Sequence, residues 1–301
     1  MSRFAQMIEL IEKHAAGREG VSECGIPRVK LFRATTPTEP LHALHEPAIC
    51  LVVQGKKRVL IGDEALDYDS SRFLTASVDV PVIGQVIEAT PQKPYLCFKL
   101  EIDRPMLAAL ALELGPDDAA EPPPGVALSP VTDELLDSAL RLLRLADTPR
   151  DIPVLAPLAE RELLYRLLAG EYGARLRQLA HADSKLSQVN RAIHWIKTNY
   201  REPFSIETLA QEARMSASAL HAHFKQVTSL SPLQYQKQMR LQEARRLIFA
   251  EAMDAASAAH EVGYESPSQF SREYRRLFGA PPMQDVMRLR EAALPIGAAA
   301  P

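Results

Sequence analysis

The sequence is poor in the features that mark secreted, membrane-spanning and metal-binding proteins. Its 301 residues include only three cysteines, Cys24, Cys50 and Cys97, which lie far apart and form no C-x-x-C pair. This number and spacing argue against a disulfide framework or a zinc knuckle, and we expect free thiols packed as small apolar groups. No apolar run approaches the roughly 18 residues that a membrane span needs.

The sequence also lacks the signatures of common enzyme classes. It has no phosphate-binding loop, no G-x-G-x-x-G fingerprint and no G-x-S-x-G elbow, which argues against nucleotide chemistry and serine hydrolysis. We predict no catalytic residue and no cofactor. The initial stretch MSRFAQMIELIEKHAAG carries Glu9 and Glu12 and lacks the apolar core of a signal peptide, so we expect a cytoplasmic protein without membrane contact.

The net charge of -3 conceals an uneven distribution of charged residues. Residues 184–301 hold 15 Lys and Arg against 11 Asp and Glu, whereas residues 1–183 hold 20 against 27. Only the carboxy-terminal part has the sign that favours binding to a polyanion, and its excess is small.

Hydrophobic periodicity divides the chain into a β-rich part and a helical part. Short apolar runs between Gly and Pro turns, such as AICLVVQ, VPVIGQVIEA and PYLCFKLEI, predict an antiparallel barrel or sandwich. Helical spacing follows over 104–114, 133–145 and 154–168, with a loop at 119–125. We predict a domain boundary at 181–184, after which every element has helical spacing.

The predicted helices between residues 133 and 168 are rich in leucine. The leucines that recur at helical spacing are Leu136, Leu140, Leu143, Leu163, Leu164 and Leu167. Either they pack on the barrel or they form the seam of a homodimer, and the pattern is compatible with both.

Residues 205–290 contain the same small design twice. The segments SIETLAQEARMSASALHAHFKQVTSLSPLQY and AASAAHEVGYESPSQFSREYRRLFGAPPMQD each predict a short helix, a tight turn and a second helix capped by Ser216 or Ser266. The connecting helix, from Pro232 to about Phe249, spans roughly 25 Å at 1.5 Å per residue. With its flanking turns it would separate the two second helices by about one DNA turn, roughly 34 Å.

This repeat resembles the DNA-binding domain of AraC/XylS-family bacterial transcription regulators. The second copy matches the family signature at Ala259, Gly263, Tyr264, Ser266, Phe270, Arg272, Tyr274, Arg275, Phe278, Gly279 and Pro282. The first copy matches it at Leu209, Ala210, Met215, Ser216, Leu220, Phe224, Lys225, Pro232, Tyr235, Arg240 and Ala244. The β-rich segment HEPAICLVVQGKKRVLIGDEALDYDSSRFLTASVDVPV further resembles the cupin-like amino-terminal domain of one subfamily.

Cupin-like barrels can be metal enzymes, which require several histidines and carboxylates on barrel strands. Here only His42, His45 and Glu46 are available, and no histidine lies between Glu46 and His181. A site with three or four such ligands is hard to assemble, so we predict no metal. A methyl-accepting repair protein on the same DNA-binding fold would need a cysteine cluster, which is absent.

The polar residues on the second helix of each copy are the candidate DNA contacts. They are Ser218, His221, Ala222 and Lys225 in the first copy, and Ser268, Gln269, Arg272, Arg275 and Arg276 in the second. His221 can hydrogen-bond a base edge, Ala222 can contact a thymine methyl, Gln269 suits adenine and Arg272 suits guanine. We expect Arg275 and Arg276 to reach phosphates, and Arg245 and Arg246 on the connecting helix to do the same.

Three residues depart from the family pattern. Arg214 and Ser229 stand where glycines are common in the first copy, so those turns are expected to be tighter or extended into helix. Asp285 replaces a tyrosine that often follows the final proline. None of the three is a groove-reading position.

These patterns together predict an α+β chain. Residues 1–183 form a cupin-like β-barrel with helices, which serves as the effector or dimerisation domain, and residues 184–301 form an all-α double helix-turn-helix domain. The resemblance implies a sequence-specific regulator of transcription that binds double-stranded DNA as a homodimer, responds to a small-molecule effector and has RNA polymerase as a candidate partner. Phe73, Tyr95 and Phe98 are candidate ligand contacts, although core packing is the better explanation of all three. The alternatives are an effector-independent DNA-binding dimer and a metal-dependent cupin enzyme fused to a DNA-binding domain.

Overall fold

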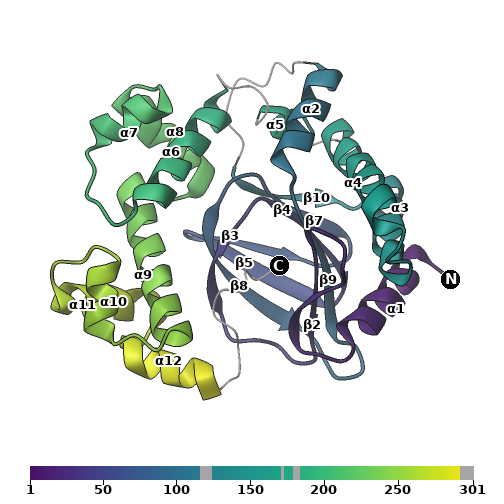
Figure 1. The fold of residues 1–301 in the computed structure, drawn as a ribbon, viewed down its shortest axis with the longest axis horizontal. Coiled ribbons are helices and arrows are strands. Elements are labelled where there is room, and N and C mark those ends of the chain that lie inside the picture. Colours follow the sequence, from purple (N-terminus) through teal and green to yellow (C-terminus); the bar gives the residue numbers. More distant parts are fainter. Residues whose placement is uncertain (116–123, 171–172, 179–183, 292–301) are drawn as a thin grey trace.

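A computed structural model describes residues 1–115, 124–170, 173–178 and 184–291, except the side chains of 174, 175 and 291 (Figure 1). The fold is α+β, as the sequence predicts, with the strands in the amino-terminal half. The strands are β1 (Gly20–Glu23), β2 (Val29–Ala34), β3 (Leu41–His45), β4 (Ala48–Gln54), β5 (Lys56–Ile61), β6 (Glu64–Tyr68), β7 (Arg72–Ala76), β8 (Val80–Glu88), β9 (Tyr95–Glu101) and β10 (Val126–Pro130).

The ten strands form two antiparallel sheets. The larger sheet has the order β1-β2-β9-β4-β7-β10, and the smaller has the order β3-β8-β5-β6. In β9, Leu96, Phe98 and Leu100 enter one hydrophobic core, whereas Tyr95 and Cys97 enter another. Both faces of this strand are therefore buried, which explains its nearly continuous apolar run. Strand β5 alternates buried and half-buried residues, because only one of its faces is fully covered.

Helices cover the outer face of the larger sheet. They are α1 (Arg3–Ala15), α2 (Arg104–Leu114), α3 (Asp133–Arg144), the 3-10 turn η1 (Leu145–Asp147), α4 (Ile152–Ala169) and α5 (Gly173–Arg177). Their apolar residues share one core with β2, β4 and β9. The helical segments predicted at 104–114, 133–145 and 154–168 are thus confirmed, while the loop at 119–125 lies mostly outside the described residues.

The leucines of α3 and α4 belong to this core. Leu136, Leu140, Leu143, Leu163, Leu164 and Leu167 are each at most 5% exposed. A dimer seam made of these leucines is therefore wrong, because burial within one chain already uses their apolar surface. The exposed apolar residues of α4 are different ones, namely Val154, Leu155, Leu158 and Tyr165.

Every regular element described after residue 184 is a helix. These elements are α6 (Lys185–Asn199), α7 (Ile206–Ala213), α8 (Ala217–Thr228), α9 (Pro232–Ala250), α10 (Ala255–Glu261), α11 (Pro267–Phe278) and α12 (Pro282–Glu291). Figure 1 shows α7 and α8 near one end of α9 and α10 and α11 near the other, beside the sheets. None of the helices in the described ranges is long and apolar enough to cross a membrane.

The hydrophobic core between the sheets continues into the helical half. One cluster joins Val78 and Val126 of the β-rich half to Leu186, Ile193 and Phe224 of the helical half. The predicted boundary at 181–184 falls almost wholly outside the described residues. Because the two halves share this core, we expect a cut there to expose apolar surface on both sides.

Candidate functional site

The first helix-turn-helix unit consists of α7 and α8. Ser205 Oγ accepts a hydrogen bond from the backbone N–H of Thr208 at 3.1 Å, and Ser216 Oγ accepts one from Ala219 at 3.2 Å. Each serine thus caps a helix by satisfying an otherwise unpaired donor. Arg214 ends α7 in the left-handed conformation, with φ of 56°, and this residue turns the chain between the two helices.

The second unit consists of α10 and α11 and repeats this geometry. Ser266 Oγ accepts a hydrogen bond from the N–H of Gln269 at 3.3 Å, and Pro267 follows as the first helical residue. At Gly263 φ is 87°, and a Cβ there would lie 2.1 Å from the carbonyl oxygen of Arg201. Only glycine fits this turn, because any side chain would collide with the backbone of the α6–α7 connection.

The first copy makes left-handed turns without glycine. Arg214 and Ser229 have φ of 56° and 59°, close to the 87° and 80° of Gly263 and Gly279 in the second copy. The helices do not extend through either residue, so that part of the expectation is wrong. Such a conformation costs a non-glycine residue about 1–2 kcal/mol, and packing of the helices on either side offsets it.

The nine predicted DNA contacts all lie on exposed surface, four on α8 and five on α11. On α8 they occupy positions i, i+3, i+4 and i+7 from Ser218, which is one stripe of a helix. On α11 they occupy i, i+1, i+4, i+7 and i+8 from Ser268. The opposite faces are buried: Leu220 and Phe224 are 0% exposed, and so is Tyr274. Each helix therefore packs by one face and presents the predicted contacts on the other.

A hydrogen-bond network around Glu273 holds the Gln269 side chain, and the sequence analysis did not predict it. The Gln269 amide donates to Glu273 Oε1 at 3.2 Å, and Glu273 also accepts hydrogen bonds from Tyr264 at 2.7 Å and Lys237 at 3.0 Å. Burial alone would raise the pKa of Glu273, but these three hydrogen bonds lower it below its usual range. The spacing of four residues between Gln269 and Glu273 was the only available hint.

Arg240 of α9 joins the two units. Its guanidinium donates to the carbonyl oxygens of Tyr200 at 2.5 Å, Arg201 at 2.9 Å and Gly263 at 2.9 Å. It also lies 5.9 Å from the ring centroid of Tyr264. One side chain thus ties the end of α6 to the turn of the second unit, so it restrains how the two reading helices are oriented.

Arg245 does not reach phosphate, contrary to the prediction. It is 4% exposed and donates to Asp285 through two hydrogen bonds, Nε to Oδ2 at 2.7 Å and Nη2 to Oδ1 at 2.9 Å. The Tyr274 hydroxyl donates to the same carboxylate at 2.9 Å. Asp285, which departs from the family pattern, is therefore the buried partner of Arg245. Arg246 is half-exposed and pairs with Glu243 at 2.8 Å.

Direct contacts fix the helical half against the sheets. Lys197 of α6 lies 2.6 Å from Asp79, whose backbone oxygen accepts a hydrogen bond from the Tyr235 hydroxyl of α9 at 2.8 Å. His42 of β3 makes an edge contact with Phe278 of α11, with ring centroids 4.9 Å apart. Burial and the nearby Arg245 charge lower the pKa of His42 to about 4, so this histidine is neutral at pH 7.

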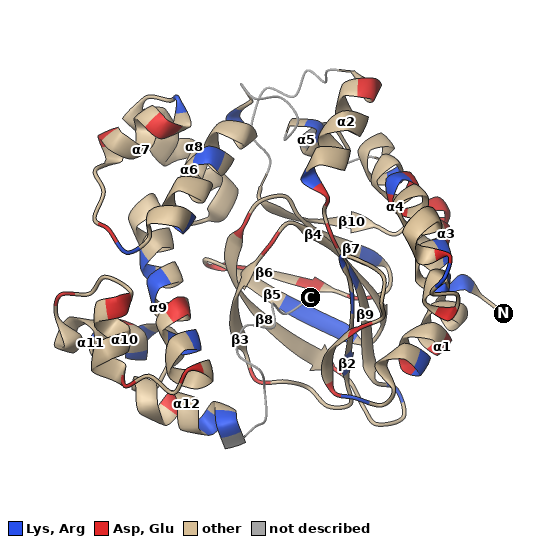
Figure 2. Cartoon of the chain, viewed as in Figure 1, with Lys and Arg blue, Asp and Glu red and all other residues tan. Residues whose placement is uncertain are grey.

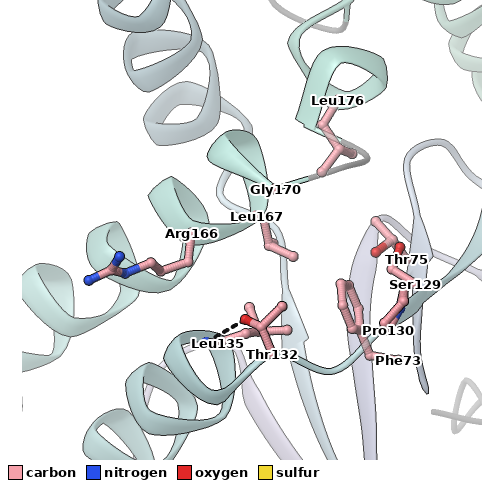
Figure 3. A pocket seen from close by; sticks show the side chains of 10 residues that line it. All are labelled: Phe73, Thr75, Ser129, Pro130, Thr132, Leu135, Arg166, Leu167, Gly170 and Leu176. Carbon is pink, nitrogen blue, oxygen red and sulfur yellow. Dashed lines mark hydrogen bonds between the residues drawn. The ribbon is translucent and has the colours of Figure 1, made fainter. Parts of the chain in front are cut away.

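The three candidate ligand contacts do not gather in one place. Phe98 and Phe73 pack in the core beneath the helices, whereas Tyr95 is buried between the sheets. Phe73 also lines a cavity of about 80 Å³ with Thr75, Ser129, Leu135 and Leu167, while Arg166 points away from these side chains (Figure 3). This volume is about half the roughly 150 Å³ of a cavity that holds benzene, so only a very small molecule would fit without rearrangement.

A larger cleft of about 400 Å³ lies between the β-rich half and α6. Its walls include Glu46, Asp79, Glu101 and Arg104 on one side and His194 and Lys197 on the other. Binding sites for small molecules are commonly in this range of volumes and often lie between domains. In the described parts of the chain, no cluster of three or more His, Cys, Asp or Glu could hold a metal ion.

The fold and the paired helices define a two-part protein in which a β-sheet domain is joined to a duplicated helix-turn-helix. A sequence profile described as "AraC-type transcriptional regulator N-terminus" matches residues 25–175, and one described as "Helix-turn-helix domain" matches residues 209–287. The chain belongs to the AraC family of transcriptional regulators.

Known relatives agree with this assignment. The HTH-type transcriptional activator RhaS of Escherichia fergusonii is 30% identical over 141 residues, which are 46% of this chain and 50% of that protein. RhaS of Salmonella schwarzengrund is 26% identical over 166 residues, or 54% and 58%. The chain thus spans about half the length of the curated relatives it matches.

Solved structures resemble the fold over most of the chain. A crystal structure of ToxT from Vibrio cholerae bound to (E)-4-(8-methylnaphthalen-1-yl)but-3-enoic acid has a TM-score of 0.59, with 9% identity, over 87% of this chain and 98% of that one. A second structure, of wild-type ToxT bound to an unsaturated fatty acid, has a TM-score of 0.59 at 10% identity, over 86% and 94%. At these identities the likeness concerns the fold alone.

Proposed function

We propose that this protein regulates transcription by binding a specific double-stranded DNA sequence through α8 and α11. One observation carries the proposal: the predicted contacts form one exposed stripe on each of two equivalent helices, which lie near opposite ends of α9. The stripes combine groups that read bases, such as Gln269 and Arg272, with basic groups that suit phosphates, such as Arg275 and Arg276.

The test is selection of DNA from a random library by the full chain, followed by titration of the selected sequence. We expect one enriched sequence with two separated half-sites and a binding constant that falls steeply with salt, because released counterions contribute to binding. Arg276→Ala should reduce the salt slope by about one, whereas Arg18→Ala, an exposed arginine far from the helical half in sequence, should not change it. Absence of any enriched sequence would contradict the proposal.

The β-rich half is proposed to be the effector domain, over residues 1–183, with the DNA-binding domain over 184–301. Two ToxT structures of the same fold hold a carboxylic acid and an unsaturated fatty acid, and the cleft against α6 offers about 400 Å³. An effector-independent DNA-binding dimer is the second candidate. A thermal-shift screen separates the two, since a ligand of the native state raises the melting temperature.

A homodimer through α4 completes the proposal. Val154 and Leu158 are 69% and 62% exposed on that helix, and Tyr165 is 41% exposed two turns further. Covering such residues with a second copy would remove apolar surface from water and bring two DNA-binding units together. Recruitment of RNA polymerase and a cytoplasmic location belong to the same proposal, because the target is DNA.

A further inference from the structure

Most lysines and arginines of the helical half are engaged within the chain. All 15 of those in residues 184–301 lie in the described range, and Figure 2 shows basic and acidic residues interspersed along α9. Nine of them pair with a carboxylate or donate to a backbone carbonyl oxygen, namely Arg191, Lys197, Arg201, Lys237, Arg240, Arg245, Arg246, Arg288 and Arg290. Each of these nine has to give up a partner before it can bind a phosphate.

The other six are exposed and have no ion pair or carbonyl partner among the described residues. Four of the six are predicted DNA contacts, namely Lys225, Arg272, Arg275 and Arg276. The remaining two are Lys185, the first residue of α6, and Arg214, which ends α7. Free cations therefore mark the reading stripes and, in addition, a place that has no predicted contact.

Lys185 and Arg214 lie at one corner of the first helix-turn-helix unit. The side-chain amide of Gln188 donates to the carbonyl oxygen of Arg214 at 3.3 Å, and residues 185 and 188 are neighbours on the surface of α6. Both cations stand at locally unfavourable positions. Lys185 is at the positive end of the α6 dipole, and Arg214 has a left-handed φ of 56°. Strained residues concentrate at functional sites, so this corner calls for a functional reason.

The equivalent turn of the second unit is closed by the chain itself. Arg214 and Gly263 are equivalent, because in both turns the N–H of the next residue donates to the carbonyl oxygen five residues earlier, at 2.9 Å. A Cβ at Gly263 would lie 2.1 Å from the carbonyl oxygen of Arg201, so that turn has no room for a side chain. The first turn is open and carries an exposed guanidinium.

The position of Arg214 relative to α8 places it where DNA phosphates are expected. In the proposed function α8 lies in the major groove, whose walls are the phosphate chains, and the first helix of such a unit crosses the DNA backbone. Arg214 ends that first helix, α7, and lies four residues before Ser218, the first predicted contact of α8. Its side chain is thus carried at the edge of the groove rather than inside it.

We propose that Arg214 binds a phosphate of the DNA backbone beside the half-site that α8 reads. This inference rests on the proposed DNA-binding function and adds a positioning residue to it. A guanidinium suits a phosphate because it can donate two parallel hydrogen bonds, and the neighbouring Lys185 adds to the positive potential. Since glycine is common at this position in the family pattern, the contact distinguishes this chain and gives its first unit an anchor that the second unit lacks.

The experiment titrates the full chain and its Arg214→Gly variant with the selected DNA at several salt concentrations. Loss of one phosphate contact reduces the log-log salt slope by about 0.9, so the variant should bind about eightfold more weakly at about 0.1 M salt, and the difference should vanish near about 1 M. The same variant should melt at least as high as the wild type, because glycine adopts a positive φ without strain. Weaker binding without lower stability is a combination that a merely structural arginine would not produce.

Three comparisons make this result specific. Ser229→Gly relieves the other left-handed turn of the first unit, where φ is 59°, but removes no charge, so it should keep the wild-type salt slope. Arg214→Lys keeps the charge and should retain most of the slope. DNA with a single uncharged methylphosphonate beside the α8 half-site should weaken the wild type at one position, and at that position it should not weaken Arg214→Gly further.

The proposal is overturned if Arg214→Gly keeps the wild-type salt slope, or if Arg214→Lys loses as much of the slope as Arg214→Gly does. Selection of DNA by the wild-type chain is measured first. Absence of any enriched sequence would contradict both the DNA-binding function and this contact, whereas an enriched sequence that Arg214→Gly binds with an unchanged slope would contradict the contact alone.

Discussion

Replacing Asp285 by asparagine should destabilise the second helix-turn-helix unit more than any single surface change. The Asp285 carboxylate is 0% exposed and accepts hydrogen bonds from Arg245 at 2.7 and 2.9 Å and from Tyr274 at 2.9 Å. Asparagine keeps the shape but leaves the Arg245 charge buried without a counter-charge. Breaking one side of a buried ion pair costs about 3–5 kcal/mol, a large share of the about 5–15 kcal/mol that stabilises a typical domain.

Urea unfolding of the full chain, followed by circular dichroism, measures this loss. The helices α10 to α12 surround the pair, so we expect part of the helical signal to disappear at lower urea than in the wild type. The matched control is Arg288→Ala. Arg288 also lies 3.2 Å from the Asp285 carboxylate but is 59% exposed, and such a pair contributes at most about 1 kcal/mol.

A double variant separates charge burial from packing. In Arg245→Met with Asp285→Asn, both charges disappear, so stability should recover toward the wild-type value. Buried charge is not the cause of the loss if Asp285→Asn lies within about 1 kcal/mol of the wild type, or if the double variant is as unstable as the single one.

Three further outcomes follow from the structure. Arg272→Ala should cost about 1–3 kcal/mol at one base position, while Arg276→Ala should weaken all sequences alike, as binding to single-base variants would reveal. Because the folded pKa of His42 is about 4 and the unfolded value is about 6.5, its contribution to stability is complete above pH 6.5 and is lost as pH falls toward 4; His42→Phe should remove this part of the pH dependence of unfolding. Leu140→Glu should unfold the protein, whereas Leu158→Glu should give a folded monomer by sedimentation.

The second helix of each copy was predictable because its signals are local. Ser216 and Ser266 mark helix starts, and the period of the apolar residues separates the packed face from the exposed face. The arginine at position 214 suggested a continued helix, whereas the residue adopts a left-handed turn with φ of 56°; the two helices on either side were still assigned correctly. Local sequence was sufficient here because each helix has one solvent-exposed face and one buried face.

Hydrophobic periodicity could not predict which side chains pair with partners far away in the sequence. In the sequence, Arg245 looks like an exposed arginine that could contact phosphate. Its partner Asp285 lies 40 residues away. The unusual aspartate was noticed in the sequence, but nothing connected it to the arginine. Likewise, Lys99 sits in an apolar run that predicts a strand, and only the register with β4 reveals that its side chain faces the space between the sheets.

The helix α4 carries apolar residues that are buried in the core and others that are exposed, and periodicity alone could not tell them apart. Helix α4 buries Leu163 and Leu167 in the core, yet it leaves Val154 and Leu158 more than 60% exposed. Periodicity detects apolar residues but cannot say which of them meet their own chain, because the first turns of α4 carry apolar residues on both faces. Since α2, α3 and α5 cover the other side of α4, the exposed apolar residues Val154 and Leu158 form the surface on which we expect a second copy to pack.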